Sequence, residues 1–348
     1  MNDLEQQFLQ LVKIANTLQQ KIIMLEEENK SLLHSHTILS QLASLANLDA
    51  EYTRKNIYFE INDPRIKRDD FFYPIIESSE TAVDEIVNNR RSMARFGDCE
   101  FSTIAHIIRQ NYQSVVDDNL SQRLIEVLNC EDEGLMIGLA DNYGNLDTYT
   151  IIAQLDIRHY LPPEVRRTHL ALLKPNKTYY NAYITRPYVL YADNQTDAPA
   201  LRFKNLKRIW DKRDCIFVEG CYTRLGYGND LFDNANSIKR ILCPAENAFF
   251  QYDKILETCL QQDKDVLFLI ALGPTASVLA YDLFKAGHQA VDIGHIDMEY
   301  EWFLQGKGRR TPVKGKYNNE LIKEMVLYPI EDETYLSQII AEIGTEEL

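Results

Sequence analysis

The stretch Met93–Glu100 (MARFGDCE) combines a short apolar run, a glycine and two carboxylates two residues apart. The apolar run predicts a strand, and the glycine predicts a turn. In an extended or tightly turned segment, residues i and i+2 point in the same direction. We therefore expect Asp98 and Glu100 to reach one hard cation, which prefers oxygen ligands. Arg95, beside them, indicates an anionic ligand. Alternatively, the acidic residues only begin a helix over 101–110, whose positive end suits carboxylates.

Helices and strands are predicted to alternate on either side of this stretch. Residues 266–272 form a continuous apolar run, which is typical of a strand buried on both faces by helices. The alternation indicates an α/β protein with a parallel sheet. We expect strands over 93–96, 134–140, 215–218, 266–272 and 290–293. We expect helices over 80–91, 101–110, 119–128, 146–161, 247–262, 274–286 and 298–304, and one more that ends over 204–211.

The N-terminal residues 1–45 carry a seven-residue repeat of leucine. The repeat is formed by Leu4, Leu11, Leu18, Leu25, Leu32 and Leu39. Successive heptads in step, without glycine or proline, predict a coiled-coil oligomerisation helix, and the single Asn29 at the alternate core position favours a parallel dimer. The alternative is one long amphipathic helix packed on its own domain. Residues 46–75 then form a connector, and residues 76–348 form the α/β domain.

Composition and charge restrict the classes of function. The net charge of −15 argues against a broad nucleic-acid surface, because neutralising phosphates requires a surplus of lysine and arginine. No apolar run approaches the length of a membrane span, and residues 1–10 are too acidic and polar for a signal peptide. The six cysteines show no C-x-x-C spacing, which fits a reducing compartment. We expect a cytoplasmic protein, either free or peripheral at the inner face of the membrane.

Polar, glycine-bearing loops follow the predicted strands. Ligands of open parallel sheets bind beyond the carboxyl ends of the strands, so these loops are expected to share one edge. Gly273-Pro274-Thr275 resembles a phosphate-binding turn at a helix start, although an ordinary strand–helix turn has the same pattern. Arg186, in Thr185–Tyr188, offers a second cation; the alternative is a structural salt bridge.

A second glycine-broken loop covers residues 224–230. Its residues Arg224, Gly226, Gly228, Asn229 and Asp230 suit a diphosphate or a sugar, because arginine makes planar bidentate contacts with phosphate. The alternative is a surface loop whose glycines serve only the turn.

Four ionisable residues, His295, Asp297, Glu299 and Glu301, occupy alternate positions. They share a face if the preceding strand continues, and otherwise the acids surround a helix start. Ionisable groups beside a buried sheet are costly unless they serve a cation or a proton transfer, so we expect one acid to act as a general base.

Several motifs, in the same order along residues 76–325, resemble those of the GT-D-fold glycosyltransferases. The motifs are Arg95–Glu100, Thr185–Tyr188, Val218–Gly220, Arg224–Phe232, Gly273–Ala276 and Asp292–Trp302. That family was first catalogued as a domain of unknown function and includes enzymes that extend glycans on serine-rich adhesins of Gram-positive bacteria. The resemblance implies a Rossmann-like catalytic domain, a UDP-hexose donor, and Mn²⁺ or Mg²⁺ at a D-x-E motif, here Asp98 and Glu100.

Roles for individual residues follow from this resemblance. The ion would bridge the diphosphate with help from Arg95 or Arg224, and His295 is a possible third ligand. An acid among Asp297, Glu299 and Glu301 would deprotonate a hydroxyl of a glycan or glycoprotein acceptor, and the displacement would invert the anomeric carbon. The residues expected to bind the donor are Arg95, Phe96, Gly97, Arg186, Glu219, Arg224, Gly226, Gly228, Asn229, Asp230, Gly273, Pro274 and Thr275.

Two other classes of function remain open at this point. A metal-dependent phosphohydrolase or nucleotide-sugar hydrolase would use the same carboxylates on a phosphate ester. A non-enzymatic assembly module would use only the coiled coil, as a homodimer through residues 1–45.

Overall fold

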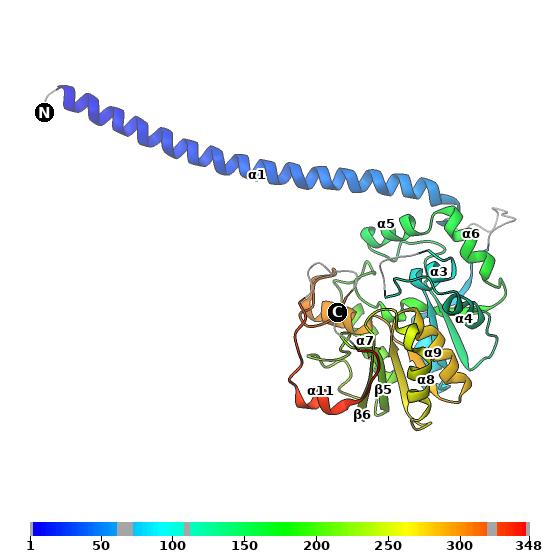
Figure 1. Ribbon diagram of the computed structural model, residues 1–348. Coiled ribbons are helices and arrows are strands. Elements are labelled where there is room, and N and C mark those ends of the chain that lie inside the picture. The colour runs from blue at the N-terminus through cyan, green and yellow to red at the C-terminus, as the bar shows by residue number, and fades with distance from the viewer. Residues whose placement is uncertain (1–2, 61–71, 108–111, 319–325, 346–348) are drawn as a thin grey trace. The chain divides into compact units, whose positions relative to one another are not determined.

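The computed structural model of the chain describes residues 3–60, 72–107, 112–318 and 326–345. The chain divides into two compact units, Met1–Asn56 and Ile57–Leu348. The first consists of most of one helix, and the second contains a sheet with helices on both faces (Figure 1). Among the described residues, none of the helices has the length and apolar content needed to cross a membrane.

Helix α1 runs over Asp3–Glu60. It confirms the predicted N-terminal helix and continues beyond residue 45 into the predicted connector, of which residues 61–71 lie outside the described part. The side chains of the leucine repeat are exposed along α1 at Leu11, Leu18, Leu25, Leu32 and Leu39. The pairing of two such helices stays a prediction.

The second unit is built on a nine-stranded sheet in the order β1-β4-β3-β2-β8-β7-β5-β6-β9. All neighbouring strands pair in parallel, which confirms the predicted α/β class. The strands are β1 (Ile75–Glu77), β2 (Ser92–Phe96), β3 (Leu135–Leu139), β4 (Thr178–Asn181), β5 (Asp214–Gly220), β6 (Ser237–Cys243), β7 (Leu267–Ala271), β8 (Gln289–Asp292) and β9 (Ile339–Glu342). The predicted strands correspond to β2, β3, β5, β7 and β8, whereas the other strands were not predicted.

Helices connect the strands, as the alternating pattern predicts. They are α2 (Ser79–Asn88), α3 (Asp98–Ile104), α4 (Asp118–Leu128), α5 (Ile151–Tyr160), α6 (Pro163–Leu172), α7 (Ala198–Leu206), α8 (Tyr252–Leu260), α9 (Pro274–Lys285), α10 (Ile296–Gln305) and α11 (Glu333–Gln338). The helix predicted over 146–161 begins later, because the side chain of Thr150 caps α5. Pro163 then begins α6, since proline suits the first helical position.

Each strand contributes side chains to both faces of the sheet, because side chains alternate along a strand. Phe96 of β2 and Phe268 of β7 pack into one hydrophobic core, whereas Met93 and Leu269 of the same strands pack into the other. Helices α3, α4, α8 and α9 cover the first face, and α2 and α7 cover the second. Figure 1 shows α4, α8 and α9 gathered on one side of the strands. The layers leave the carboxyl ends of the strands open.

Candidate active site

The carboxyl ends of the central strands surround a cavity of about 390 Å³. β2 and β8 are neighbours in the middle of the sheet, and the chain leaves them on opposite sides, which is where ligands of open α/β sheets bind. The predicted residues that line this cavity are Arg95, Gly97, Asp98, Glu100, Arg186, Gly273 and His295. We refer to it as the central cavity.

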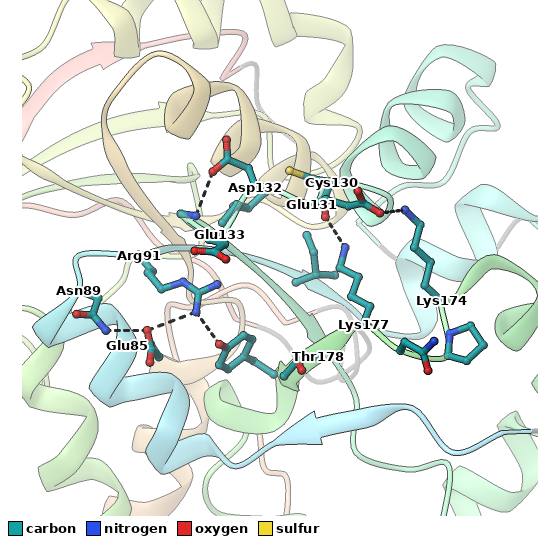
Figure 2. A pocket seen from close by; sticks show the side chains of 16 residues that line it. Glu85, Asn89, Arg91, Cys130, Glu131, Asp132, Glu133, Lys174, Lys177 and Thr178 are labelled. Carbon is teal, nitrogen blue, oxygen red and sulfur yellow. Dashed lines mark hydrogen bonds and ion pairs between the residues drawn. The ribbon is translucent and has the colours of Figure 1, made fainter.

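A larger cavity, of about 910 Å³, lies near the amino ends of β3 and β4 (Figure 2). Several of its charged groups are engaged in structural contacts. The Lys174 ammonium lies 2.5 Å from the Glu131 carboxylate, and the Arg91 guanidinium donates to the Tyr180 hydroxyl at 2.6 Å. Lys177 donates to the backbone carbonyl of Leu128, near the end of α4. Position and chemistry therefore favour the central cavity as the active site.

Asp98 and Glu100 lie in the first turn of α3 rather than in an extended segment. Residues i and i+2 of a helix do not face each other, so the expected extended geometry is wrong, and the two acids begin a helix, which is the geometry of the alternative. The Glu100 carboxylate accepts the Gly97 backbone N–H at 2.7 Å, which caps the helix. Burial raises the pKa of Glu100 to about 7. Both carboxylates nevertheless line the central cavity.

Arg95 is held by the end of β8. Its guanidinium contacts the Asp292 carboxylate at 2.7 Å and donates to the Asp292 backbone carbonyl at 3.0 Å. Burial raises the pKa of Asp292, although Arg95 opposes this effect. Gly294 is required here, because its φ is +42° and an added Cβ would lie 1.9 Å from a guanidinium nitrogen of Arg95. Arg95 is thus positioned by the adjacent strand.

Arg186, His295 and Tyr112 form a chain of contacts at the wall of the cavity. The Arg186 guanidinium lies 3.2 Å from Nδ1 of His295, and the Tyr112 hydroxyl lies 3.3 Å from Nε2. Since arginine can only donate, Nδ1 accepts, and a neutral ring carries its proton on Nε2. His295 therefore has protein groups at both nitrogens, and acting as a metal ligand would require it to exchange one of them.

No cluster of three or more histidine, cysteine or acidic side chains with the spacing of a metal site occurs among the described residues. Asp98, Glu100 and His295 are therefore not assembled as a ready three-ligand site. The donor set still fits a hard cation, because Asp98 and Glu100 supply carboxylate oxygens to one cavity. The metal stays a proposal.

The turn that resembles a phosphate-binding turn lies at the start of α9. Gly273 caps that helix with a φ of +55°, and Pro274 occupies its first turn. An added Cβ at Gly273 would lie 2.6 Å from Cβ of Tyr112, so glycine allows the close approach of that tyrosine. Gly273 lines the central cavity, whereas Thr275 is buried in the helix.

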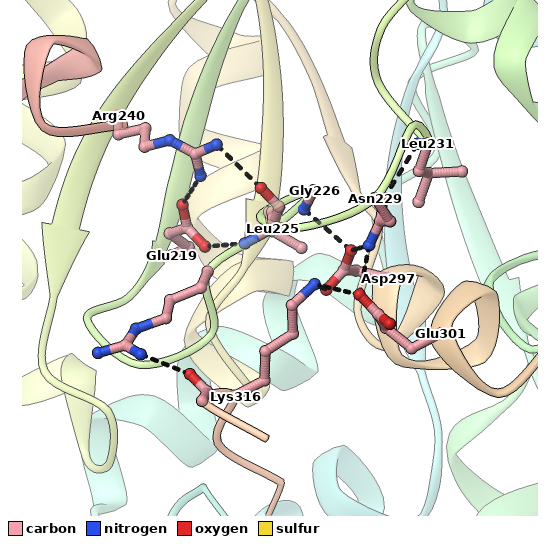
Figure 3. A network of polar contacts seen from close by, with 11 residues as sticks. Glu219, Leu225, Gly226, Asn229, Leu231, Arg240, Asp297, Glu301 and Lys316 are labelled. Atoms are coloured by element: carbon pink, nitrogen blue, oxygen red, sulfur yellow. Dashed lines mark hydrogen bonds and ion pairs between the residues drawn. The ribbon is translucent and has the colours of Figure 1, made fainter. Parts of the chain in front are cut away.

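Two of the acids after His295, Asp297 and Glu301, belong to a separate polar network (Figure 3). Asp297 and Glu301 lie one helical turn apart on α10, so they share a face. Lys316 donates to Asp297 at 2.6 Å and to Glu301 at 2.8 Å, and Asn229 donates to the same two carboxylates. Burial lowers the pKa of Lys316, but the two carboxylates more than offset this and raise it. Asp297 also accepts the backbone N–H of Gly226.

The other end of this network holds Glu219 at the end of β5. Its carboxylate contacts the Arg240 guanidinium at 2.5 Å and accepts the backbone N–H of Leu225 at 2.7 Å (Figure 3). Burial raises the pKa of Glu219, against the effect of Arg240. We call the set Glu219, Asn229, Arg240, Asp297, Glu301 and Lys316 the buried charge network.

Other predicted residues also serve the protein rather than the cavity. Arg224 donates to two backbone carbonyls, those of Gly315 and Tyr328, each at 2.7 Å. Asp230 accepts the Tyr300 hydroxyl at 2.7 Å, and Glu299 accepts the backbone N–H groups of Tyr188 and Val189. The predicted residues outside the cavity lining are Phe96, Glu219, Arg224, Gly226, Gly228, Asn229, Asp230, Pro274, Thr275, Asp297, Glu299 and Glu301.

Some residues of the central cavity were not predicted. Asn142 follows β3, donates to the Tyr183 hydroxyl at 3.1 Å, and has an amide oxygen that is buried without a partner. Its place after a strand was a usable signal. Tyr112, Tyr183 and Arg310 also line the cavity, but no motif marks them.

A parallel sheet flanked by helices, with carboxylates, arginines and a glycine turn at its central crevice, defines a Rossmann-like α/β protein with a charged cavity at that crevice. Residues 93–321 match the family described as "Glycosyltransferase GT-D fold". The chain therefore belongs to the GT-D-fold glycosyltransferases, as the sequence motifs indicated.

Relatives and solved structures agree with this membership. The chain is 37% identical over 276 residues to a probable glycosyl transferase of Streptococcus gordonii and 34% identical over 275 residues to the glycosyltransferase GlyD of Streptococcus pneumoniae. Each alignment covers 77% of this chain but only 39% and 32% of those proteins, so the chain spans about a third of their length.

Two solved structures share the fold. One is described as a new glycosyltransferase from Streptococcus sanguinis, with a TM-score of 0.72 and 35% identity, covering 78% of this chain and 100% of that one. The other is a highly conserved domain of unknown function described as having a distinct glycosyltransferase fold. It has a TM-score of 0.72 and 33% identity, and the match covers 78% of this chain and 96% of that one.

Proposed function

We propose that this chain transfers a hexose from a nucleotide-sugar donor, specifically a UDP-sugar, to a hydroxyl of a glycan or glycoprotein, with the help of Mn²⁺ or Mg²⁺. One observation carries the proposal: two carboxylates and two arginines converge on a cavity at the β2–β8 crevice. Membership of a glycosyltransferase family supports sugar transfer as the reaction.

Asp98 and Glu100 are the residues that would hold the divalent ion. A bound ion of this kind neutralises the negative charge that develops on a departing diphosphate. The start of α3 suits this arrangement, since backbone N–H groups there add a positive field beside the same phosphates.

Arg186 would bind the diphosphate oxygens directly, and Arg95, whose guanidinium is bonded to Asp292 and to the backbone carbonyl of Ala182, would add positive charge beside them. Arginine forms bidentate hydrogen bonds with phosphate, and both side chains line the central cavity. Arg224 is unsuited to this role, because its guanidinium is committed to backbone carbonyls of Gly315 and Tyr328. The buried amide oxygen of Asn142 would accept a hydroxyl of the bound sugar.

The acceptor hydroxyl must lose its proton during a direct, inverting displacement. Of the residues predicted to be catalytic, Asp297, Glu299 and Glu301 lie outside the lining of the central cavity, whereas His295 lines it. We therefore propose His295 as the general base. Because its Nδ1 accepts from Arg186 and its Nε2 carries the proton, Arg186 would have to release Nδ1 before that nitrogen takes the proton of the acceptor hydroxyl, while Tyr112 holds the ring at Nε2.

The test is incubation of the full chain with a panel of nucleotide sugars, Mn²⁺ and saccharide acceptors, with released nucleoside diphosphate as the readout. We expect turnover with a UDP-sugar that EDTA abolishes and that excess Mn²⁺ restores. Turnover indifferent to EDTA would exclude the metal. Release that is equally fast without any acceptor would establish a nucleotide-sugar hydrolase instead.

We also propose that α1 pairs with the α1 of a second copy. The exposed leucine repeat gives each helix an apolar stripe at heptad spacing, which a second identical helix covers by knobs-into-holes packing. All six cysteines are free thiols, which supports our placement of the protein in the reducing cytoplasm, where nucleotide sugars are available.

A further inference from the structure

Another cavity, of about 420 Å³, lies on the same edge of the sheet as the central cavity, and we refer to it as the second cavity of this edge. It is bordered by residues that follow or end β1, β3 and β4, namely Ser78, Asp141 and Asn181. β1, β4, β3 and β2 are consecutive strands of the sheet and run parallel, so their carboxyl ends share one edge. Tyr183 lines both cavities. The two cavities therefore adjoin across a single side chain.

Tyrosine rings form much of the wall of this second cavity. The ring of Tyr149 lies 5.7 Å from that of Tyr183 and 5.5 Å from that of Tyr191, between centroids. Tyr149 and Tyr191 are further joined by an antiparallel backbone bridge. The Arg202 guanidinium lies 4.2 Å from the centre of the Tyr191 ring and is fixed by two hydrogen bonds to Asp193. The aromatic wall is thus held in place without a ligand.

The residues of this wall suit a sugar ring. A tyrosine offers an apolar face for the C–H groups of a sugar and a hydroxyl for its polar edge. Asp141, Asn181 and Thr148 add hydrogen-bonding groups around the same space. A cavity of this volume, aromatic with a few polar groups, is typical of small-molecule sites, which measure about 300–1,000 Å³.

The charge of the second cavity differs from that of the central cavity. Glu80, Asp141 and Asp193 line it, and its one cation among the described lining residues, Arg202, is paired with Asp193. The central cavity has four acids in its lining but also three arginines, Arg95, Arg186 and Arg310. The second cavity therefore offers a diphosphate fewer cations, which favours a neutral, polyhydroxylated ligand there.

We propose that the second cavity, which we call the tyrosine cavity, binds the acceptor as a neutral saccharide, with the reacting hydroxyl directed past Tyr183 toward the central cavity. This inference rests on the proposed function, because it assigns the second substrate of the same reaction. The proposed ligand is a saccharide, and binding of a charged nucleotide in this cavity would contradict the proposal.

A filling substitution tests the proposal without removing a packed side chain. Ala192 is exposed and lines the tyrosine cavity, so Ala192→Trp occupies its space. The matched control is Ala200→Trp, on α7, which is equally exposed but does not line the cavity. We expect the KM for a p-nitrophenyl saccharide acceptor to rise about tenfold or more in Ala192→Trp, while the Kd for UDP with Mn²⁺ stays within about twofold. The control should match the native protein in both.

Direct binding keeps the test independent of transfer. Saturation-transfer NMR with the full chain and a panel of p-nitrophenyl mono- and disaccharides should give signals that vanish in Ala192→Trp and persist in Ala200→Trp. A native KM in Ala192→Trp, loss of UDP binding in that variant, or no saccharide binding to the native chain would each overturn the proposal. Saccharide binding without turnover of any donor would instead reject the proposed function and leave the saccharide site standing.

Discussion

The central cavity and the buried charge network lie toward the same edge of the sheet, and both are rich in ionisable residues, yet they are built differently. Around the cavity, Asp98 is exposed and faces space that a ligand can enter. In the network, Lys316, Asp297 and Glu219 are buried and their charges are matched by protein groups. Acidic residues at strand ends thus have two uses, and only the position of the opposite charge distinguishes them.

The difference has a simple energetic origin. A buried charge is costly unless a partner and hydrogen bonds replace the lost water, so every member of the network has such a partner. An exposed charge at a cavity, such as that of Asp98, remains in contact with water and can exchange it for a ligand. The following predictions use this contrast.

The largest effect is expected from Lys316→Met, which leaves the buried Asp297 and the partly buried Glu301 without their cation. We expect the free energy of unfolding in urea to fall by about 3–5 kcal/mol. Lys307→Met removes a lysine that is exposed and should leave that free energy unchanged. A loss below about 1 kcal/mol, together with lost transfer, would move the network into the catalytic machinery.

Asp98→Asn should reduce the activity rather than the stability of the protein. We expect transfer to fall by about 100- to 1,000-fold, because a group that acts on the developing charge is lost, while the melting temperature stays close to that of the native protein. Asp118→Asn is the matched control, since Asp118 is also an exposed acid in the first turn of a helix. Transfer within about fivefold of native in Asp98→Asn would remove this residue from the proposed metal site.

Gly294→Ala is expected to have a smaller effect. Gly294 lines the central cavity, and the adjacent Arg95 is paired with the buried Asp292 carboxylate. Both this variant and Gly287→Ala place alanine at a positive φ, but only at Gly294 does the new Cβ collide with Arg95. We expect Gly294→Ala to destabilise the protein by about 1–3 kcal/mol more than Gly287→Ala, because Arg95 must leave the buried Asp292 carboxylate. Equal unfolding free energies for the two variants would mean that the Arg95–Asp292 contact contributes nothing measurable.

The smallest effect on catalysis is expected in α1. Leu18→Glu combined with Leu25→Glu places charges in the apolar stripe and should halve the mass measured by light scattering, with transfer within about twofold of native. The control, Thr17→Glu combined with Gln20→Glu, changes positions outside the stripe and should keep the mass. If the native chain already has the mass of one copy, the proposed pairing is wrong.

The sequence allowed the central strands to be predicted better than the outer ones. β7 is apolar throughout because helices cover both its faces, so its pattern is visible without tertiary information. β1 has three residues, and β6 begins with exposed and charged residues, so neither has a continuous apolar run. Outer strands depend on pairing with a distant neighbour, which a local pattern does not record.

For the candidate site, position after a predicted strand was a sound guide to Asp98 and His295, which line the central cavity. Arg186 also lines it, but it follows β4, which was not predicted, and was selected from the motif Thr185–Tyr188. The same rule also selected Asp297 and Glu219, because a carboxylate after a strand looks the same whether it faces a ligand or a lysine. Their counter-ions, Lys316 and Arg240, lie in segments that no motif marks. Those pairings became visible only in three dimensions.

The position of Lys316 in the sequence also determines the order in which parts of the protein can fold during synthesis. Asp297 and Glu301 leave the ribosome before Lys316, and β9, which pairs with β6, is made later still. During that interval the two carboxylates lack their cation and β6 presents an open edge, so one side of the sheet stays incomplete until β9 has been made. Helix α1 has no such delay, because its hydrogen bonds join residues that are close in the chain. Translation therefore completes the helix first and the α/β domain last.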